Sequence, residues 1–169
     1  MPRGTVPSGL VVGIGNRLRG DDAAGCLVAD ALLAGPHPGF DIVTSDGNVS
    51  TLLDWFGRYS AIALVDAVLG AEAARPWRWD VLAAPLPRSW SRASSHAFGL
   101  AEAVELARVL GLLPRRLVAY GVPARDFGFA APLSAPARRG VSRTAARIRR
   151  EWRLLPCIRD LTETPLAVK

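Results

Sequence analysis

Short apolar runs alternate with amphipathic helical patterns along most of the chain. Apolar runs at 10–14, 40–44, 61–65 and 116–120 predict strands, and 79–83 predicts a further strand at a sheet edge, because prolines lie on both sides of it. A repeat near 3.6 residues predicts helices at 22–33, 50–56, 98–110 and 137–152. This alternation predicts a three-layer α/β/α sandwich around a mostly parallel, twisted sheet of about five strands.

The composition fits one globular domain. The chain has 169 residues, of which 50% are hydrophobic and 21% charged, which is too apolar for a disordered chain and enough for a substantial core. Its 16 glycines follow no period and it has only two cysteines, which excludes collagen-like and disulfide-rich scaffolds. No run approaches the roughly 20 apolar residues of a membrane span, and no secretory signal precedes the first strand. We therefore expect a cytoplasmic protein without a membrane span.

The net charge of +6 says little about nucleic acid. Every basic residue except Lys169 is an arginine, and alanine, leucine and proline are abundant, which indicates a GC-rich codon bias more than a binding footprint. We expect no nucleic-acid partner. The arginines of the last predicted helix are explained either by a solvated face or by an acidic protein partner.

Polar residues follow several of the predicted strands. In an open α/β sheet the carboxyl ends of the strands meet at one rim, where ligands usually bind. His96 directly precedes a predicted helix and can reach the same rim. The residues expected there are Gly15, Asn16, Asp22, Asp46, Asn48, Asp66 and His96.

Taken singly, these residues have ordinary structural explanations. Asp21 suits a helix N-cap and Asp22 the helix dipole, while a histidine beside serines is commonly a cap. The loop at 13–16 lacks the third glycine of a dinucleotide fingerprint, where Leu18 stands, and no phosphate-binding lysine follows. Close backbone approach at the sheet edge explains Gly13 and Gly15 instead.

Taken together, the Asp21–Asp22 pair, Asp66 and His96 can bring two carboxylates and one imidazole to one cleft. Asp66 ends a buried strand in this prediction, where a carboxylate needs a hydrogen bond, an ion pair or a cation. Such a set with an open coordination position suits a borderline divalent metal such as Ni²⁺ or Zn²⁺. The other histidine, His37, lies between two prolines and is expected to be solvated.

The ordered motifs resemble the [NiFe]-hydrogenase maturation endopeptidases over about residues 10–152. The N-terminal signature GIGNRLRGDD is followed by SDG, by LVDA, by SHAFGL, and by YGVP with PLS after it, at 13–22, 45–47, 64–67, 95–100, 120–123 and 132–134. The resemblance implies one peptidase-like α/β domain over 1–169, with its core at about 9–155 and flexible termini. It also implies a monomeric hydrolase.

Members of that family remove a C-terminal extension from the hydrogenase large-subunit precursor after nickel has been inserted. The resemblance assigns the nickel-binding trio to Asp22, Asp66 and His96, with the nickel supplied by the precursor and not held by the free enzyme. The first residue of the trio is often glutamate in the family, so Asp22 reaches about one methylene less. Gly15, Asn16, Asp46 and Asn48 are expected to support the loops or to orient the substrate chain.

Two other interpretations stay open at this point. The chain could be a non-catalytic protein that keeps the family scaffold and docks to a hydrogenase or a maturation factor. It could also be a nucleotide- or nucleic-acid-binding α/β module, although the missing glycine and lysine disfavour this.

Overall fold

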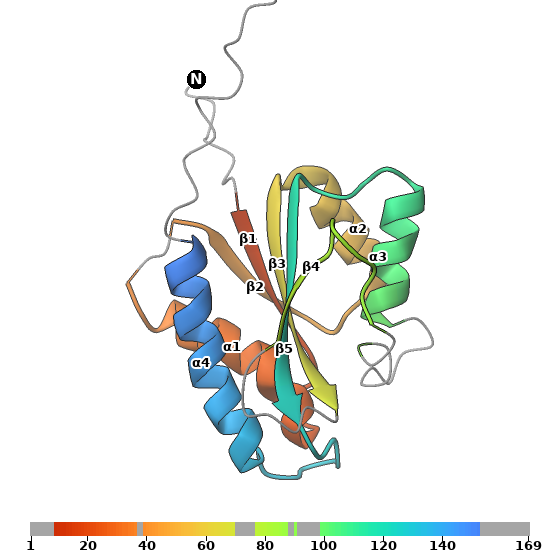
Figure 1. Ribbon diagram of the computed structural model, residues 1–169. Helices are drawn as coiled ribbons and strands as arrows, with labels where there is room; N and C mark the ends of the chain where they lie inside the picture. Colours follow the sequence, from red (N-terminus) through yellow and green to blue (C-terminus); the bar gives the residue numbers. More distant parts are fainter. Residues whose placement is uncertain (1–8, 37–38, 70–76, 88–89, 91–98, 153–169) are drawn as a thin grey trace, which may run out of the picture.

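A five-stranded sheet forms the centre of the computed structural model, which describes residues 9–36, 39–69, 77–87, 90 and 99–152. The strand order is β2-β1-β3-β5-β4, and all neighbours are parallel except β4, which runs antiparallel to β5 (Figure 1). The strands are β1 (Gly9–Ile14), β2 (Asp41–Ser45), β3 (Ala61–Leu69), β4 (Trp77–Asp80) and β5 (Arg116–Ala124). The predicted mostly parallel sheet is thus confirmed.

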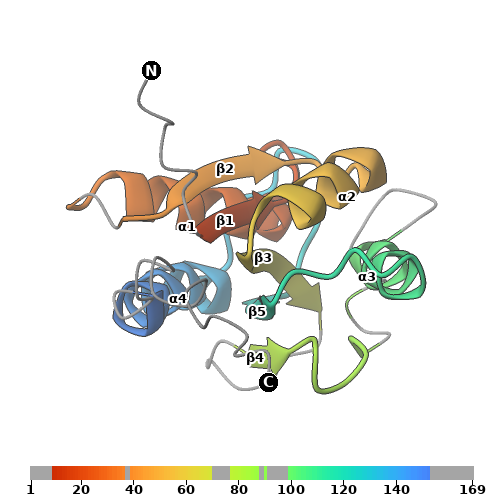
Figure 2. The same ribbon diagram turned by 90° about the horizontal axis from the view of Figure 1, so that it is seen from above.

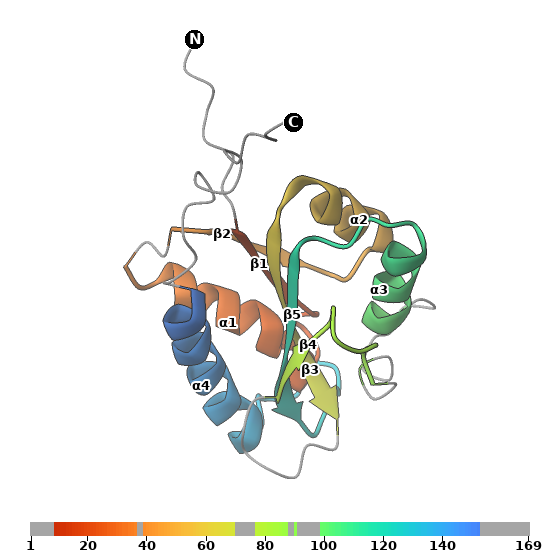
Figure 3. The same ribbon diagram turned by 45° about the horizontal axis from the view of Figure 1, so that its top comes forward.

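Helices cover both faces of this sheet. They are α1 (Ala24–Leu33), α2 (Val49–Arg58), α3 (Leu100–Val109) and α4 (Ala135–Trp152), and a short 3₁₀ turn, η1 (Gly20–Ala23), precedes α1. Figures 2 and 3 show α1 and α4 on one side of the sheet and α2 and α3 on the other, which gives the predicted α/β/α layers. Within the described ranges, no helix is long and apolar enough to cross a membrane.

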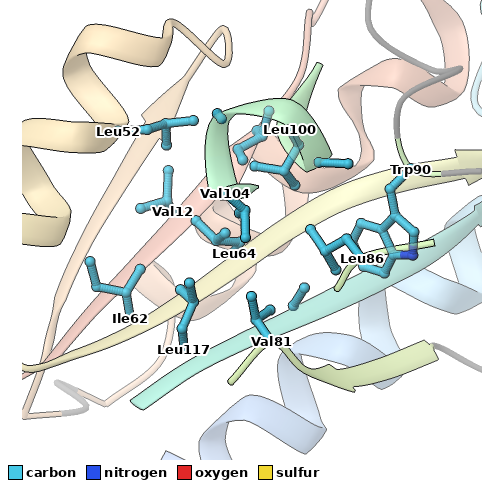
Figure 4. Close-up of a cluster of buried hydrophobic side chains, with 14 of the residues drawn as sticks. Val12, Leu52, Ile62, Leu64, Val81, Leu86, Trp90, Leu100, Val104 and Leu117 are labelled. Carbon is cyan, nitrogen blue, oxygen red and sulfur yellow. The ribbon is translucent and has the colours of Figure 1, made fainter. Parts of the chain in front are cut away.

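Two apolar clusters, one on each face, bury the central strands. Alternate residues of β3 enter different clusters, because successive side chains of a strand point to opposite faces. Ile62 and Leu64 contact the cluster under α2 and α3, together with Val104 and Leu117 (Figure 4). Val65 belongs to the cluster under α1 and α4. The run 61–65 is therefore buried on both faces, as its sequence predicts.

Three strands have ends that differ clearly from the predictions, and one of them is β5, which continues past Tyr120 to Ala124. β4 begins and ends earlier than 79–83, because the Asp80 carboxylate accepts hydrogen bonds from the backbone N–H of Leu82 and of Ala83 and closes a turn there. β3 continues past Asp66 to Leu69, because β5 pairs with it as far as the partners Leu69 and Ala124. Asp66 thus lies within a strand and not at its end, which corrects that prediction.

Glycines allow α1 to lie directly on the sheet. A Cβ atom on Gly25 of α1 would stand 2.1 Å from the carbonyl oxygen of Ile14 and 2.4 Å from that of Val65. Gly13 of β1 lies against the same part of α1, since a Cβ atom on Gly13 would be 2.3 Å from the carbonyl oxygen of Gly25. The close approach inferred from the glycine loop is present, and it holds the start of α1 at the carboxyl end of β1.

Glu151 joins the end of α4 to the sheet. Its carboxylate accepts hydrogen bonds from Tyr120 Oη (2.6 Å), Arg78 Nε (2.9 Å) and Arg147 Nε (2.6 Å), and Trp152 Nε1 donates to Tyr120 Oη. Burial alone would raise the pKa of Glu151, but the hydrogen bonds from Arg147, Tyr120 and Arg78 outweigh it and lower that pKa to about 2. The network fastens both β4 and α4 to β5.

Glu151→Gln is expected to lower the free energy of unfolding by about 1 kcal/mol at pH 7, because two ion pairs lose their charge. A lowered folded-state pKa stabilises the protein above the unfolded pKa of 4.5, and this contribution is lost as the pH falls toward 2. The difference between wild type and variant in urea unfolding should therefore shrink from pH 7 to pH 3. Glu105→Gln, which removes only a partly exposed pair with Arg108, is the control. A difference independent of pH would contradict the role of the charge.

Candidate functional site

A pocket of about 390 Å³ opens at the carboxyl end of the parallel strands. It lies where β1 stops: the pairing of β1 with β3 ends at Gly13 and Val65, whereas β3 continues beside β5. The residues that line it come from β1 and the loop after it, from the start of α1, from the end of β2, and from β3: Ile14, Gly15, Asn16, Arg17, Asp22, Cys26, Thr44, Ser45, Asp46 and Asp66. Five of the residues that the sequence placed at the rim therefore line one pocket.

Asp66 is the most deeply buried acid in this pocket. Its relative exposure is 4%, and its Oδ1 accepts a hydrogen bond of 2.7 Å from the backbone N–H of Ala67. Burial, with a smaller contribution from the nearby charge of Asp22, raises the pKa of Asp66 to about 8, although the Ala67 hydrogen bond opposes this. The carboxyl group at this position is therefore poorly compensated by the protein, and a cation in the pocket would stabilise its charged form.

Asp22 reaches the pocket from η1. It is 5% exposed, and its Oδ2 lies 3.8 Å from Nη1 of Arg19. Its backbone is held close to the glycine loop, since a Cβ atom on Gly15 would stand 1.8 Å from the carbonyl oxygen of Asp22. Gly15 also has φ +143°, which other residues rarely adopt. Glycine at position 15 is therefore required for this close approach of the Asp22 backbone.

The loops after β1 and β2 shape the rest of the pocket. Oδ1 of Asn16 accepts a hydrogen bond from the backbone N–H of Leu18, and Oδ1 of Asp46 accepts one from that of Asn48. Gly15 donates its N–H to the carbonyl oxygen of Ser45, which ties the two loops together. Asn48 does not line the pocket: it is the N-cap of α2 and accepts a hydrogen bond from the backbone N–H of Thr51.

Cys26 lines the pocket, although it lies in the apolar helical pattern of 22–33. It follows Asp22 by one helical turn, so this spacing was the available signal that both share a face. Its Sγ lies 3.6 Å from the carbonyl oxygen of Gly15. Burial raises the pKa of the Cys26 thiol, with Arg17 opposing it. The thiol is therefore neutral near pH 7 and poorly suited to act as a nucleophile.

His96 lies outside the described residues, so the structure gives no position for the third member of the proposed trio. Among the residues that are described, no three histidine, cysteine or acidic side chains gather closely enough to hold a metal. Asp66 has the same strand parity as Leu64 and Val68, which places it toward the α2 and α3 face, and α3 begins at Leu100, shortly after His96 in the sequence. Within the described residues, the pocket therefore offers two buried carboxylates, which are hard oxygen donors.

Asp21 does not cap α1, contrary to the prediction. The N-cap of α1 is Ala23, and Asp21 is fully buried within η1. Its carboxylate instead accepts hydrogen bonds from the backbone N–H groups of Arg125 (2.7 Å), Asp126 (3.2 Å) and Ser134 (2.6 Å). A contact more than a hundred residues away in sequence explains this acid, so local capping rules could not identify it.

Asp21→Ala is expected to lower the free energy of unfolding by about 3 kcal/mol, because three backbone donors lose a charged acceptor. Chemical denaturation of the purified variant measures this loss. Asp126→Ala is the control: its exposed side chain accepts only the local N–H of Gly128, so its removal should cost well under half as much. Equal losses in the two variants would show that Asp21 is not the anchor of the loop.

The fold of the chain is similar to those of several solved structures. The chain is similar to the [NiFe] hydrogenase maturation protease HybD from Thermococcus kodakarensis, with a TM-score of 0.62 and 17% identity over 85% of this chain and 98% of that one. It is similar to HycI from the same organism, with a TM-score of 0.61 and 23% identity over 85% and 91%. It is also similar to hydrogenase 2 maturation peptidase from a Thaumarchaeota archaeon, with a TM-score of 0.57 and 26% identity over 85% and 96%.

Comparisons of the sequence with family models and with curated proteins give no match. The likeness is therefore one of fold. Over about 85% of its length, the chain has the fold of the [NiFe]-hydrogenase maturation proteases, as the resemblance of its motifs predicts.

Proposed function

We propose that the protein is a nickel-dependent endopeptidase that removes the C-terminal extension of a [NiFe]-hydrogenase large-subunit precursor after nickel has been inserted. The observation that carries this proposal is the pairing of Asp22 and Asp66, two buried acids on one pocket. The likeness in fold to hydrogenase maturation proteases supports the same reaction class.

The electrostatics of the pocket favour an incoming cation. Two buried carboxyl groups disfavour each other's charge, and the pKa of Asp66 is already raised to about 8 by burial and by Asp22. A divalent ion between them would stabilise both charged forms and would release the proton of Asp66. In this proposal the ion arrives as part of the precursor, so the pocket recognises only substrate that already contains nickel.

The residues of the chain then have distinct tasks. Asp22 and Asp66 would hold the ion through their carboxylate oxygens, and His96 would supply a nitrogen donor. A metal held at a peptide bond polarises the scissile carbonyl or lowers the pKa of a bound water. Asn16 and Asp46 line the same pocket and are proposed to support the loops against which the substrate chain lies. Because the thiol of Cys26 is neutral, the proposal assigns it no covalent step.

Incubation of the chain with nickel-loaded precursor tests the proposal. Intact-mass spectrometry should show loss of the C-terminal fragment, and the same precursor prepared without nickel should keep its full mass. Stable binding without cleavage would instead favour the non-catalytic docking protein considered from the sequence. Cleavage of both precursors at the same rate would contradict the requirement for the ion.

A further inference from the structure

Two exposed apolar side chains lie on loops whose backbones meet next to the pocket-lining segment 16–17. Leu18 is 63% exposed and Phe129 is 80% exposed. They come from loops far apart in sequence, which meet where the N–H of Ala130 donates a 2.8 Å hydrogen bond to the carbonyl oxygen of Leu18. We call them the Leu18–Phe129 surface. Asn16 and Arg17, which directly precede Leu18 in the chain, line the pocket, so the loop that carries Leu18 leads out of it.

The loops that carry this surface are fixed by several contacts. Asp21 holds the start and the end of the Phe129 loop by its three backbone hydrogen bonds, and its own N–H donates to Asp126. Gly20 leaves room for that approach, because a Cβ atom there would stand 2.7 Å from the Asp126 oxygen. Ala130 has φ +54°, a conformation that is unfavourable for alanine. The fold therefore holds a large apolar side chain in water with a strained backbone beside it.

The charges around the surface indicate the kind of partner. The stretch 125–139 contains Arg125, Arg138 and Arg139, all exposed, against one exposed acid, Asp126. In Figure 1 the start of α4, which carries Arg138 and Arg139, lies at the same end of the molecule as the arrowhead of β5. An apolar contact within a cationic rim fits a polypeptide with an apolar side chain and acidic residues near it.

We propose that the Leu18–Phe129 surface docks an apolar, acid-flanked segment of the same polypeptide whose bond is cleaved in the pocket. This inference rests on the proposed function. It places substrate recognition on a surface outside the carboxylate pair, so that binding of the precursor protein and recognition of its ion use different residues. Phe129 is the anchor, because large exposed aromatic side chains contribute most to such contacts.

Phe129→Ser tests the proposal, with Val109→Ser as the matched control. Val109 is 83% exposed and is the last residue of α3. Figure 1 shows the C-terminal end of α3 at the opposite end of the sheet from the β5 arrowhead. For nickel-loaded precursor, Phe129→Ser should raise KM roughly tenfold and leave kcat at saturation near the wild-type value. The affinity of the precursor for uncleaving Asp66→Asn protein should fall by the same factor when Phe129→Ser is added. Val109→Ser should change neither quantity.

Other outcomes overturn the proposal and can be told apart. If the wild type cleaves precursor and Phe129→Ser has the same KM and affinity, the docking surface is wrong while the proposed function stands. If the wild type neither binds nor cleaves precursor, both are wrong. If sedimentation shows a wild-type dimer that Phe129→Ser converts to a monomer, a second copy of the chain covers the surface, and the proposal fails. An equal rise in KM for both variants also overturns it.

Discussion

Asp66→Asn is expected to abolish processing of nickel-loaded precursor, with a loss of roughly 10³-fold or more in the single-turnover rate. Asparagine keeps the volume of the side chain and an oxygen that can accept the Ala67 N–H, so the local structure of β3 should persist. It cannot supply a negative charge to a cation, which is the task that the proposal gives to Asp66. Release of the C-terminal fragment, followed by mass spectrometry, measures the effect.

The same variant should be more stable than the wild type, and the gain should depend on pH. The folded-state pKa of Asp66 is raised to about 8 from 3.8, so ionisation opposes folding. Stability from this group is fully present below pH 3.8, is lost progressively as the pH rises toward 8, and is constant above that. Asp66→Asn removes this dependence, and its gain should reach a few kcal/mol near pH 8, to order of magnitude.

Asp54→Asn is the control for both measurements, because Asp54 is a half-exposed acid on α2 that pairs only with Arg58 among the salt bridges of the described residues. It should keep the wild-type cleavage rate and the wild-type pH dependence. Wild-type cleavage by Asp66→Asn would remove this residue from the mechanism. A stability gain that does not change between pH 4 and pH 8 would show that the buried carboxyl is not destabilised by its charge.

Gly25→Ala is expected to have the largest effect on stability. Its new methyl group would stand 2.1 Å and 2.4 Å from two backbone oxygens, of Ile14 and Val65, and neither can rotate away as a side chain could. The start of α1 would have to move off the sheet, with a loss of about 3 kcal/mol or more. Thermal and denaturant unfolding measure this loss. Because η1 precedes α1 directly, Asp22 should also shift, and cleavage should fall with stability.

Gly57→Ala provides the matched comparison within another helix. Nothing lies within 4 Å of the Cβ position at Gly57 on α2, so alanine should stabilise the protein by roughly 0.5–1 kcal/mol through its higher helix propensity. Opposite signs for the two glycine-to-alanine changes are therefore expected. A mild effect of both would mean that α1 does not lie as close to β1 and β3 as described.

The layers of the fold could be predicted because they depend on local patterns. The continuous apolar run of β3 and the stripe along α4 both appear in the sequence before any contact is known. The ends of the strands could not be predicted as well from the sequence. The extension of β3 to Leu69 depends on its pairing with β5, and the end of β4 depends on the Asp80 turn. Pairing between distant segments determines such boundaries, and no local window contains it.

In the candidate site, too, some residues could be predicted from the sequence and others could not. The rule that loops meet at the carboxyl ends of parallel strands was enough to bring Asp22, Asp46 and Asp66 to one pocket. The role of Asp21 was missed, because its partners are backbone N–H groups at 125–134, which carry no signal in the sequence. Cys26 was missed because an apolar helix pattern does not distinguish a core residue from a pocket residue.

The claim that three side chains share the ion of the substrate is tested most directly by the two histidines of the chain. The rate of fragment release from nickel-loaded precursor is measured for His96→Ala and for His37→Ala, the only other histidine variant that the sequence allows. We expect no detectable release by His96→Ala and the wild-type rate for His37→Ala. Release at the wild-type rate by His96→Ala would contradict that claim.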